Sequence, residues 1–149
     1  MKILYVCTGN TCRSPMAEGI TNAIAKEENK DVLALSAGLY PLVGEPVSGE
    51  AVVAVGNKID ISSHRARAVT PALLEAADWV LAMTLAHKEE LVYRYPEWKD
   101  KIKTLAEMAG EKEDVADPYR QPQSVYDETV TQLEKYIVMA LNRAMSQEL

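Results

Sequence analysis

Short apolar runs alternate along the chain with longer stretches in which apolar residues recur at helical spacing. The apolar runs are typical of strands buried on both faces, as in a parallel sheet, and cover residues 2–7, 32–35, 79–83 and, more weakly, 102–105. The periodic stretches predict helices over residues 14–28, 48–56, 71–77 and 85–95, and a last helix from Ser124 with an apolar stripe that runs to Ala144. Ser14 precedes Pro15 and is expected to cap the first helix. This alternation favours an α/β domain with a parallel sheet and right-handed crossovers.

Two segments are expected to be loops. Residues 38–47 contain repeated Gly and Pro, and residues 106–123 are polar with two prolines. Loops as long as the second are often functional. In sheets of this kind, ligands bind beyond the carboxyl ends of the strands, where the segment after the first strand also lies.

Composition and charge narrow the possible functions. A chain of 149 residues with 48% hydrophobic and 26% charged residues is expected to form one globular domain, without a membrane span. The net charge of −6 disfavours a nucleic-acid-binding surface. The start of the chain does not resemble a signal peptide, so we expect a cytoplasmic protein. Two cysteines and two histidines far from them make neither a disulfide framework nor a zinc site, and no metal or cofactor is expected.

The segment from Cys7 to Ser14 combines features of an anion site with a nucleophile. Between the first strand and the first helix it can curl so that its backbone N–H groups point inward, at the positive end of the helix dipole. Gly9 and Asn10 are the residue types that tolerate a left-handed turn, and Arg13 can hold two phosphate oxygens. The same positive field favours the thiolate of Cys7, and the Ser14 hydroxyl can donate to it. This geometry suits transfer of a phosphoryl group to sulfur.

The residues alone leave other interpretations open. A cysteine at the end of a strand can be a small core residue, and a glycine-containing loop before a helix can bind phosphate without catalysis or form a simple turn. Asp117 precedes Pro118 in the long polar loop, where Asp-Pro-Tyr is also common in ordinary turns. His64 is consistent with a hydrogen-bonded structural histidine, and His87 with an exposed position on a helix.

The segment VCTGNTCRSPMAE resembles the catalytic loop of the low-molecular-weight protein tyrosine phosphatase family. The resemblance extends over residues 1–149 as a single phosphatase domain, through Ser36-Ala37-Gly38, His64 and Asp117-Pro118-Tyr119. It implies a three-layer α/β fold in which helices flank a central four-stranded parallel sheet. It also implies hydrolysis of phosphorylated proteins without a metal, through a phosphocysteine intermediate.

The resemblance also implies a role for individual residues. Cys7 resembles the nucleophile, Arg13 the phosphate-binding arginine and Asp117 the general acid that later activates water. Four residues resemble the network that supports the loop and the thiolate: Asn10, Ser14, Ser36 and His64. The phosphate is expected to lie against the loop residues Thr8, Gly9, Asn10, Thr11, Cys12, Arg13 and Ser14, and the pocket walls are expected to be Leu39, Tyr40 and Tyr119.

Cys12 is the second thiol of the loop. In the family that the loop resembles, the neighbouring cysteine can trap the oxidised nucleophile as a disulfide, which would protect Cys7 from further oxidation. The alternative is that Cys12 is a packed spacer.

Thr11 bears on the substrate. Tyrosine-directed members usually have an aliphatic residue at this position, whereas CTGNTCR is similar to the bacterial protein arginine phosphatases. We therefore expect phosphoarginine as the substrate, with Asp117 able to hold the guanidinium. In arginine phosphatases, Gly-Gly tends to follow the Asp-Pro-aromatic segment, whereas Arg120-Gln121-Pro122 follows it here. Arg120 near the pocket mouth would repel a free arginine side chain.

Three alternatives remain at this point. Thr11 could be a neutral replacement in a phosphatase for phosphotyrosine or broad phosphomonoesters. A thioredoxin-coupled arsenate reductase needs two further cysteines, and no cysteine follows Cys12. A non-catalytic phosphate-binding module would have no use for the full set of Cys7, Arg13, Ser14 and Asp117. A monomer is expected.

Overall fold

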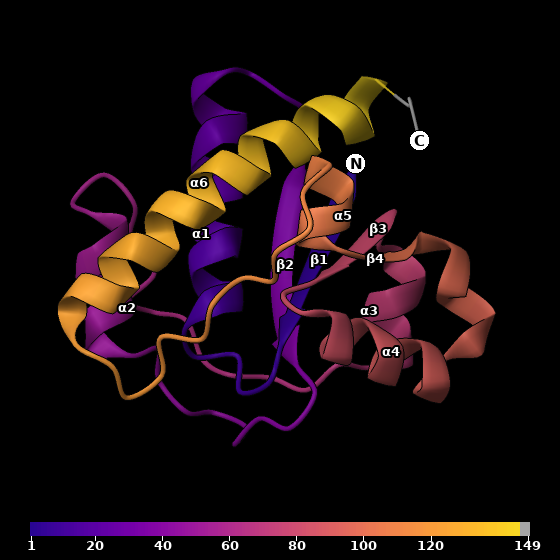
Figure 1. The fold of residues 1–149 in the computed structure, drawn as a ribbon, viewed down its shortest axis with the longest axis horizontal. Coiled ribbons are helices and arrows are strands. Elements are labelled where there is room, and N and C mark those ends of the chain that lie inside the picture. Colours follow the sequence, from indigo (N-terminus) through magenta and orange to yellow (C-terminus); the bar gives the residue numbers. More distant parts are fainter. Residues whose placement is uncertain (147–149) are drawn as a thin grey trace.

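The centre of the molecule is a parallel sheet. In the computed structural model, which describes residues 1–146, the sheet has four strands in the order β2-β1-β3-β4 (Figure 1). Their bounds are β1 Lys2–Cys7, β2 Leu33–Gly38, β3 Trp79–Ala82 and β4 Ile102–Thr104. In the register, Cys7 lies opposite Gly38 and Val6 opposite Ala82. Each pair is parallel, so the expected four-stranded parallel sheet is confirmed.

Helices cover both faces of the sheet, which gives the three expected layers. Their bounds are α1 Arg13–Glu27, α2 Gly49–Val55, α3 Pro71–Ala76, α4 Leu85–Arg94, the 3₁₀ helix η1 Pro96–Lys101, α5 Leu105–Ala109 and α6 Gln123–Ser146. Side chains of α1, α2, α5 and α6 pack with Ile3 and Tyr5 on one face of β1. Helices α3 and α4 lie on the other face (Figure 1), where their side chains pack with Leu4 and Val6. The odd and even positions of β1 therefore face separate cores, as the alternation of side chains along a strand requires.

The ends of some elements differ from those that the sequence predicts. Ser48, Thr70 and Thr84 cap their helices through their side chains. Ser14, in contrast, does not cap α1: the helix already begins at Arg13, and Ser14 lies within its first turn. The cap prediction failed because the Ser14 hydroxyl bonds to the side chains of Cys7 and Asn10 instead of to backbone.

The segment expected to be a loop over residues 106–123 begins with a short helix. Thr104 and Glu107 form a capping box at the start of α5, in which each side chain accepts from the other residue's backbone N–H. Gly110, with φ of 78°, ends the helix in the left-handed conformation. The prediction of a strand through Leu105 and a loop directly after it was therefore wrong.

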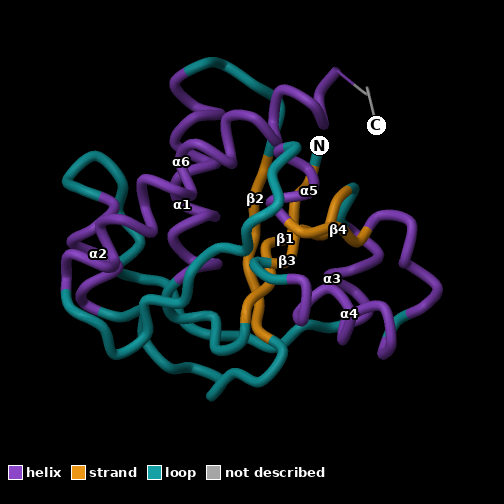
Figure 2. Tube along the Cα trace, in the orientation of Figure 1, coloured by secondary structure: helices purple, strands orange, loops and turns teal. Residues whose placement is uncertain are grey.

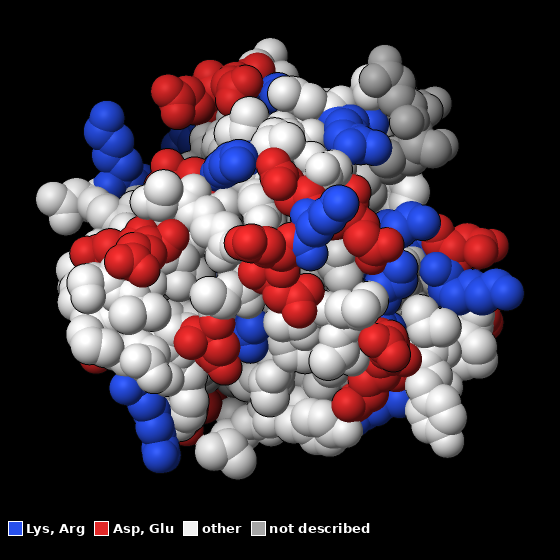
Figure 3. Space-filling view, viewed as in Figure 1, with Lys and Arg blue, Asp and Glu red and all other residues white. Residues whose placement is uncertain are grey.

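The loops that follow the strands gather at one end of the sheet (Figure 2). Basic and acidic side chains are interspersed over the face seen in Figure 3. Within residues 1–146, none of the helices has both the length and the apolar character that crossing a membrane requires.

Candidate active site

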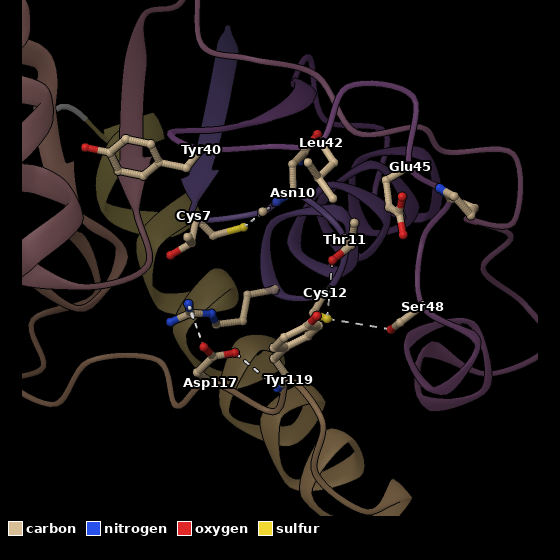
Figure 4. A pocket seen from close by; sticks show the side chains of 14 residues that line it. Cys7, Asn10, Thr11, Cys12, Tyr40, Leu42, Glu45, Ser48, Asp117 and Tyr119 are labelled. Carbon is tan, nitrogen blue, oxygen red and sulfur yellow. Dashed lines mark hydrogen bonds and ion pairs between the residues drawn. The ribbon is translucent and has the colours of Figure 1, made fainter.

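A pocket of about 370 Å³ opens at the carboxyl end of β1 (Figure 4). Its floor is the segment from Cys7 to Arg13, which joins β1 to α1. Its walls are Tyr40, Leu42, Glu45, Pro46, Ser48, Asp117 and Tyr119. The pocket thus combines the strand end and helix start expected of an anion site with segments from the loops around residues 40–48 and 117–119.

The floor turns sharply at Asn10. Asn10 has φ of 58°, the left-handed conformation that Asn tolerates better than most residues, whereas Gly9 does not adopt it. Gly38 lies directly behind the loop: a Cβ there would come within 2.7 Å of the Thr8 carbonyl oxygen. The end of β2 must therefore be glycine so that the loop can pack against it.

Cys7 lies at the bottom of the pocket with two hydrogen-bond donors at its sulfur. The thiol is buried, and its Sγ is 2.8 Å from Ser14 Oγ and 3.3 Å from the Asn10 backbone N–H. Both donors stabilise a thiolate more than a thiol, because an anionic sulfur accepts stronger hydrogen bonds. The floor thus places two donors and the start of α1 around the Cys7 sulfur.

A chain of hydrogen bonds, buried except at its outer end, fixes which way these donors point. Ser36 Oγ donates to Glu18 Oε1 at 2.8 Å, so its oxygen accepts from Asn10 Nδ2 at 3.0 Å. The same Asn10 amide donates to Ser14 Oγ at 2.9 Å. The Ser14 oxygen is thereby occupied as an acceptor, which leaves its hydrogen for Cys7 Sγ. Each O–H and N–H hydrogen of Ser36, Ser14 and the Asn10 amide is used once in this chain.

The remaining polar groups of Asn10 are also satisfied. His64 Nε2 lies 2.9 Å from the Asn10 carbonyl oxygen, and the backbone N–H of Arg67 donates to Asn10 Oδ1 at 3.0 Å. The structure thus brings Asn10, Ser14, Ser36 and His64 together. The sequence analysis missed Glu18, although it lies in the motif VCTGNTCRSPMAE, and the backbone contact of Arg67.

Arg13 and Asp117 face each other across the pocket. The Arg13 side chain is 6% exposed, and one guanidinium nitrogen donates to the Val115 carbonyl oxygen at 3.1 Å. The other lies 3.5 Å from Asp117 Oδ2. Asp117 is half exposed, and its Oδ1 accepts from the Tyr119 backbone N–H at 3.1 Å, so it is positioned yet open to a ligand.

Cys12 lies beside the floor with polar neighbours of its own. Its Sγ is 3.4 Å from the Tyr126 hydroxyl and 3.6 Å from Ser48 Oγ. Burial raises the pKa of Tyr126 to about 12, so the hydroxyl stays protonated at neutral pH and can donate to the sulfur. Both cysteines are free thiols.

Two of the three predicted wall residues line the pocket. Tyr40 and Tyr119 are 63% and 55% exposed at its mouth, and the guanidinium of Arg94 lies 4.7 Å above the Tyr40 ring. The prediction was wrong for Leu39, which packs into the core beneath α3 and α4. Side chains alternate along the extension of β2, so Leu39 points inward where Tyr40 points out.

The prediction of an exposed His87 was also wrong. His87 is only 8% exposed, and its Nε2 lies 2.8 Å from Thr8 Oγ1 in the pocket floor. Burial and then the nearby charge of Arg13 lower the pKa of His87 to about 4. His87 is four residues before the buried Leu91 on α4, and this helical spacing was the signal that could have placed it inward.

The profile of the low molecular weight phosphotyrosine protein phosphatase family matches residues 2–148. The chain belongs to this family. The chain is similar to a protein-arginine-phosphatase of Bacillus subtilis, which is 38% identical over 138 residues, or 92% of each chain. It is also similar to the low molecular weight protein-tyrosine-phosphatase PtpB of Staphylococcus epidermidis, which is 34% identical over 134 residues, covering 89% of this chain and 91% of that one.

Solved structures agree with this assignment. The crystal structure of a low molecular weight protein tyrosine phosphatase from T. tengcongensis superimposes with a TM-score of 0.93 at 48% identity, over 96% of this chain and 99% of that one. The expected fold and the expected class of enzyme, a protein phosphatase, are therefore confirmed.

Proposed function

We propose that the protein hydrolyses phosphoarginine in protein substrates through a phosphocysteine intermediate. The observation that carries the choice of substrate is Thr11, a polar residue in the pocket floor between Asn10 and Cys12. A β-branched polar side chain there leaves a floor that accepts a planar, polar guanidinium-linked phosphate. The similarity to the arginine phosphatase of Bacillus subtilis supports the same choice.

In the first step of the proposed reaction, the Cys7 thiolate attacks phosphorus. The P–S bond forms while the P–N bond breaks, and Asp117 gives its proton to the departing guanidine nitrogen. Arg13 and the backbone N–H groups of the loop hold the phosphoryl oxygens as negative charge develops on them. The position of Asp117 at the open side of the pocket, 3.5 Å from Arg13, suits this role.

In the second step, a water molecule attacks phosphorus and passes a proton to Asp117. The P–S bond breaks, inorganic phosphate leaves, and the electron pair returns to Cys7. The Ser14 hydroxyl, 2.8 Å from the sulfur, stabilises the leaving thiolate.

Phosphotyrosine is the second candidate substrate. The exposed rings of Tyr40 and Tyr119 at the pocket mouth favour it, because they can stack on an aryl group. The S. epidermidis and T. tengcongensis relatives support the same alternative.

The two candidates are separated by kinetics on matched peptides. Phosphoarginine and phosphotyrosine peptides of one sequence are assayed with the native protein, Thr11→Ile and Cys7→Ser. We expect the native protein to prefer phosphoarginine, Thr11→Ile to shift the preference toward phosphotyrosine, and Cys7→Ser to hydrolyse neither. Preference of the native protein for phosphotyrosine would instead make it a tyrosine phosphatase in which Thr11 is neutral.

A further inference from the structure

His87 is a buried titratable residue to which the proposed reaction gives no role. It extends from the first turn of α4, and its Nε2 lies 2.8 Å from the hydroxyl of Thr8. Within residues 1–146, its Nδ1 is buried and has no hydrogen-bond partner. A buried nitrogen without a partner costs stability, so a histidine at this position calls for an explanation other than stability.

The ring is neutral over the physiological range. Its pKa is lowered to about 4 by burial and by Arg13, against the opposing effects of Asp114, Asp117 and Glu90. A neutral imidazole has one N–H, so the choice of tautomer decides the direction of the bond to Thr8.

The two tautomers have opposite consequences for the pocket. If Nε2 accepts, the hydrogen of the Thr8 hydroxyl is consumed and its oxygen presents only lone pairs to the pocket. If Nε2–H donates, the Thr8 hydrogen is free to point into the pocket, whose floor Thr8 lines with an exposed side chain. A phosphoryl group bound beside Arg13 presents acceptor oxygens. These oxygens repel the lone pairs of Thr8 in the first tautomer and accept a hydrogen bond from the Thr8 hydroxyl in the second.

We propose that His87 donates through Nε2–H to Thr8 and thereby orients the Thr8 hydroxyl as a donor to the bound phosphoryl group. Thr8 is then a phosphate ligand through its side chain, and His87 is a positioning residue behind it. In this tautomer, the unpartnered Nδ1 is an acceptor rather than a stranded N–H group. The proposal rests on phosphoryl transfer at Cys7 and is independent of the choice between arginine and tyrosine substrates.

A double-mutant cycle tests this coupling. Thr8→Val removes the hydroxyl at nearly constant shape, and His87→Leu removes the imidazole at similar size. Each single variant is expected to lower kcat/KM and the affinity for inorganic phosphate by about tenfold, the worth of one charge-assisted hydrogen bond. Because both act through one hydroxyl, the double variant should lose no more than Thr8→Val alone.

Further variants separate positioning from a structural role. His87→Gln keeps an N–H donor and should recover most of the activity and phosphate affinity. His87→Leu should melt at the native temperature or above it, since it removes a buried unpartnered nitrogen. Lys88→Met is the matched control on α4, because Lys88 pairs with Glu107 at 2.9 Å instead of contacting the floor, and it should leave kcat/KM unchanged.

Three results would each overturn the proposal. The double variant could lose the sum of the two single losses in kcat/KM, His87→Leu could bind phosphate with native affinity, or the losses in kcat/KM could follow the melting temperature. Calorimetric titration with inorganic phosphate gives this answer even if turnover is absent. Failure of the proposed function has a different signature, which is no turnover by the native protein or unchanged turnover in Cys7→Ser.

Discussion

The carboxylate of Glu18 and the sulfur of Cys7 lie at the two ends of one chain of hydrogen bonds. Ser36, Asn10 and Ser14 form the links between them, at 2.8, 3.0, 2.9 and 2.8 Å from the first bond to the last. Glu18 takes the hydrogen of Ser36, so the Ser36 oxygen accepts one N–H of the Asn10 amide. The other N–H of that amide goes to the Ser14 oxygen, which leaves the Ser14 hydrogen for Cys7. Glu18, on the second turn of α1, thus helps to hold the Asn10 amide, and that amide directs the Ser14 hydroxyl at the nucleophile.

Glu18→Ala is therefore expected to slow catalysis without touching the pocket. Ser36 loses its acceptor and can rotate, which weakens the order of the chain and lowers kcat/KM by roughly threefold to tenfold. Steady-state kinetics measure the loss. Glu27→Ala, at the exposed end of the same helix, is the matched control. Equal kinetics in Glu18→Ala and the native protein would show that Glu18 is not needed to hold the Asn10 amide that directs Ser14.

Asp117→Asn should distinguish between leaving groups. The variant cannot donate a proton, so hydrolysis of phosphoesters with poor leaving groups should fall far more than hydrolysis of activated esters. A series of aryl phosphates of increasing leaving-group pKa measures this as a steeper dependence of kcat/KM on that pKa. Equal losses across the series would mean that Asp117 is not the general acid.

His87 should make the fold less stable in acid. Its pKa is about 4 in the folded protein and 6.5 without burial, so between these values the unfolded chain binds a proton that the folded protein does not. The free energy of unfolding therefore falls as pH drops from about 6.5 to about 4, and this contribution is constant above and below that window. Denaturation at a series of pH values measures this. Between pH 6.5 and 4, the free energy of unfolding should fall less with decreasing pH for His87→Leu than for the native protein. The same dependence of the free energy of unfolding on pH in both proteins would contradict a lowered pKa of His87.

Cys12 is expected to make oxidative inactivation reversible. Peroxide oxidises the Cys7 thiolate to a sulfenic acid, and attack by Cys12 forms a disulfide and releases water. Dithiothreitol should then restore activity in the native protein and less of it in Cys12→Ser. Activity assays before and after reduction measure the difference. Irreversible loss in both proteins would leave Cys12 as a packed residue that contacts Tyr126 and Ser48.

The sequence predicts best what adjacent residues determine. The catalytic loop, its strand and its helix are contiguous, so the position of Cys7, Arg13 and Ser14 could be inferred from residues 2–28. The capping box of Thr104 and Glu107 was equally local and could have predicted α5. The start of α1 was harder to predict, because Ser14 makes its bonds to side chains of the loop instead of capping the helix.

Long-range contacts account for what the sequence analysis missed. Glu18 gains its role from Ser36, and His87 from Thr8, which lies 79 residues earlier in the chain. Leu39 and Tyr40 are adjacent, and only the path of the chain beyond β2 decides which of them faces the pocket. Helical and strand periodicity identify an inward face, but not the polar group that this face meets.

The central claim is that Cys7 accepts the phosphoryl group of phosphoarginine. Rapid mixing of the native protein with a phosphoarginine peptide, followed by quenching and peptide mass spectrometry, tests it directly. We predict a phosphoryl group on Cys7 that forms and decays at rates consistent with turnover and is absent in Cys7→Ser. A phosphoryl group on another residue, or one that forms on Cys7 from the matched phosphotyrosine peptide alone, would contradict the account.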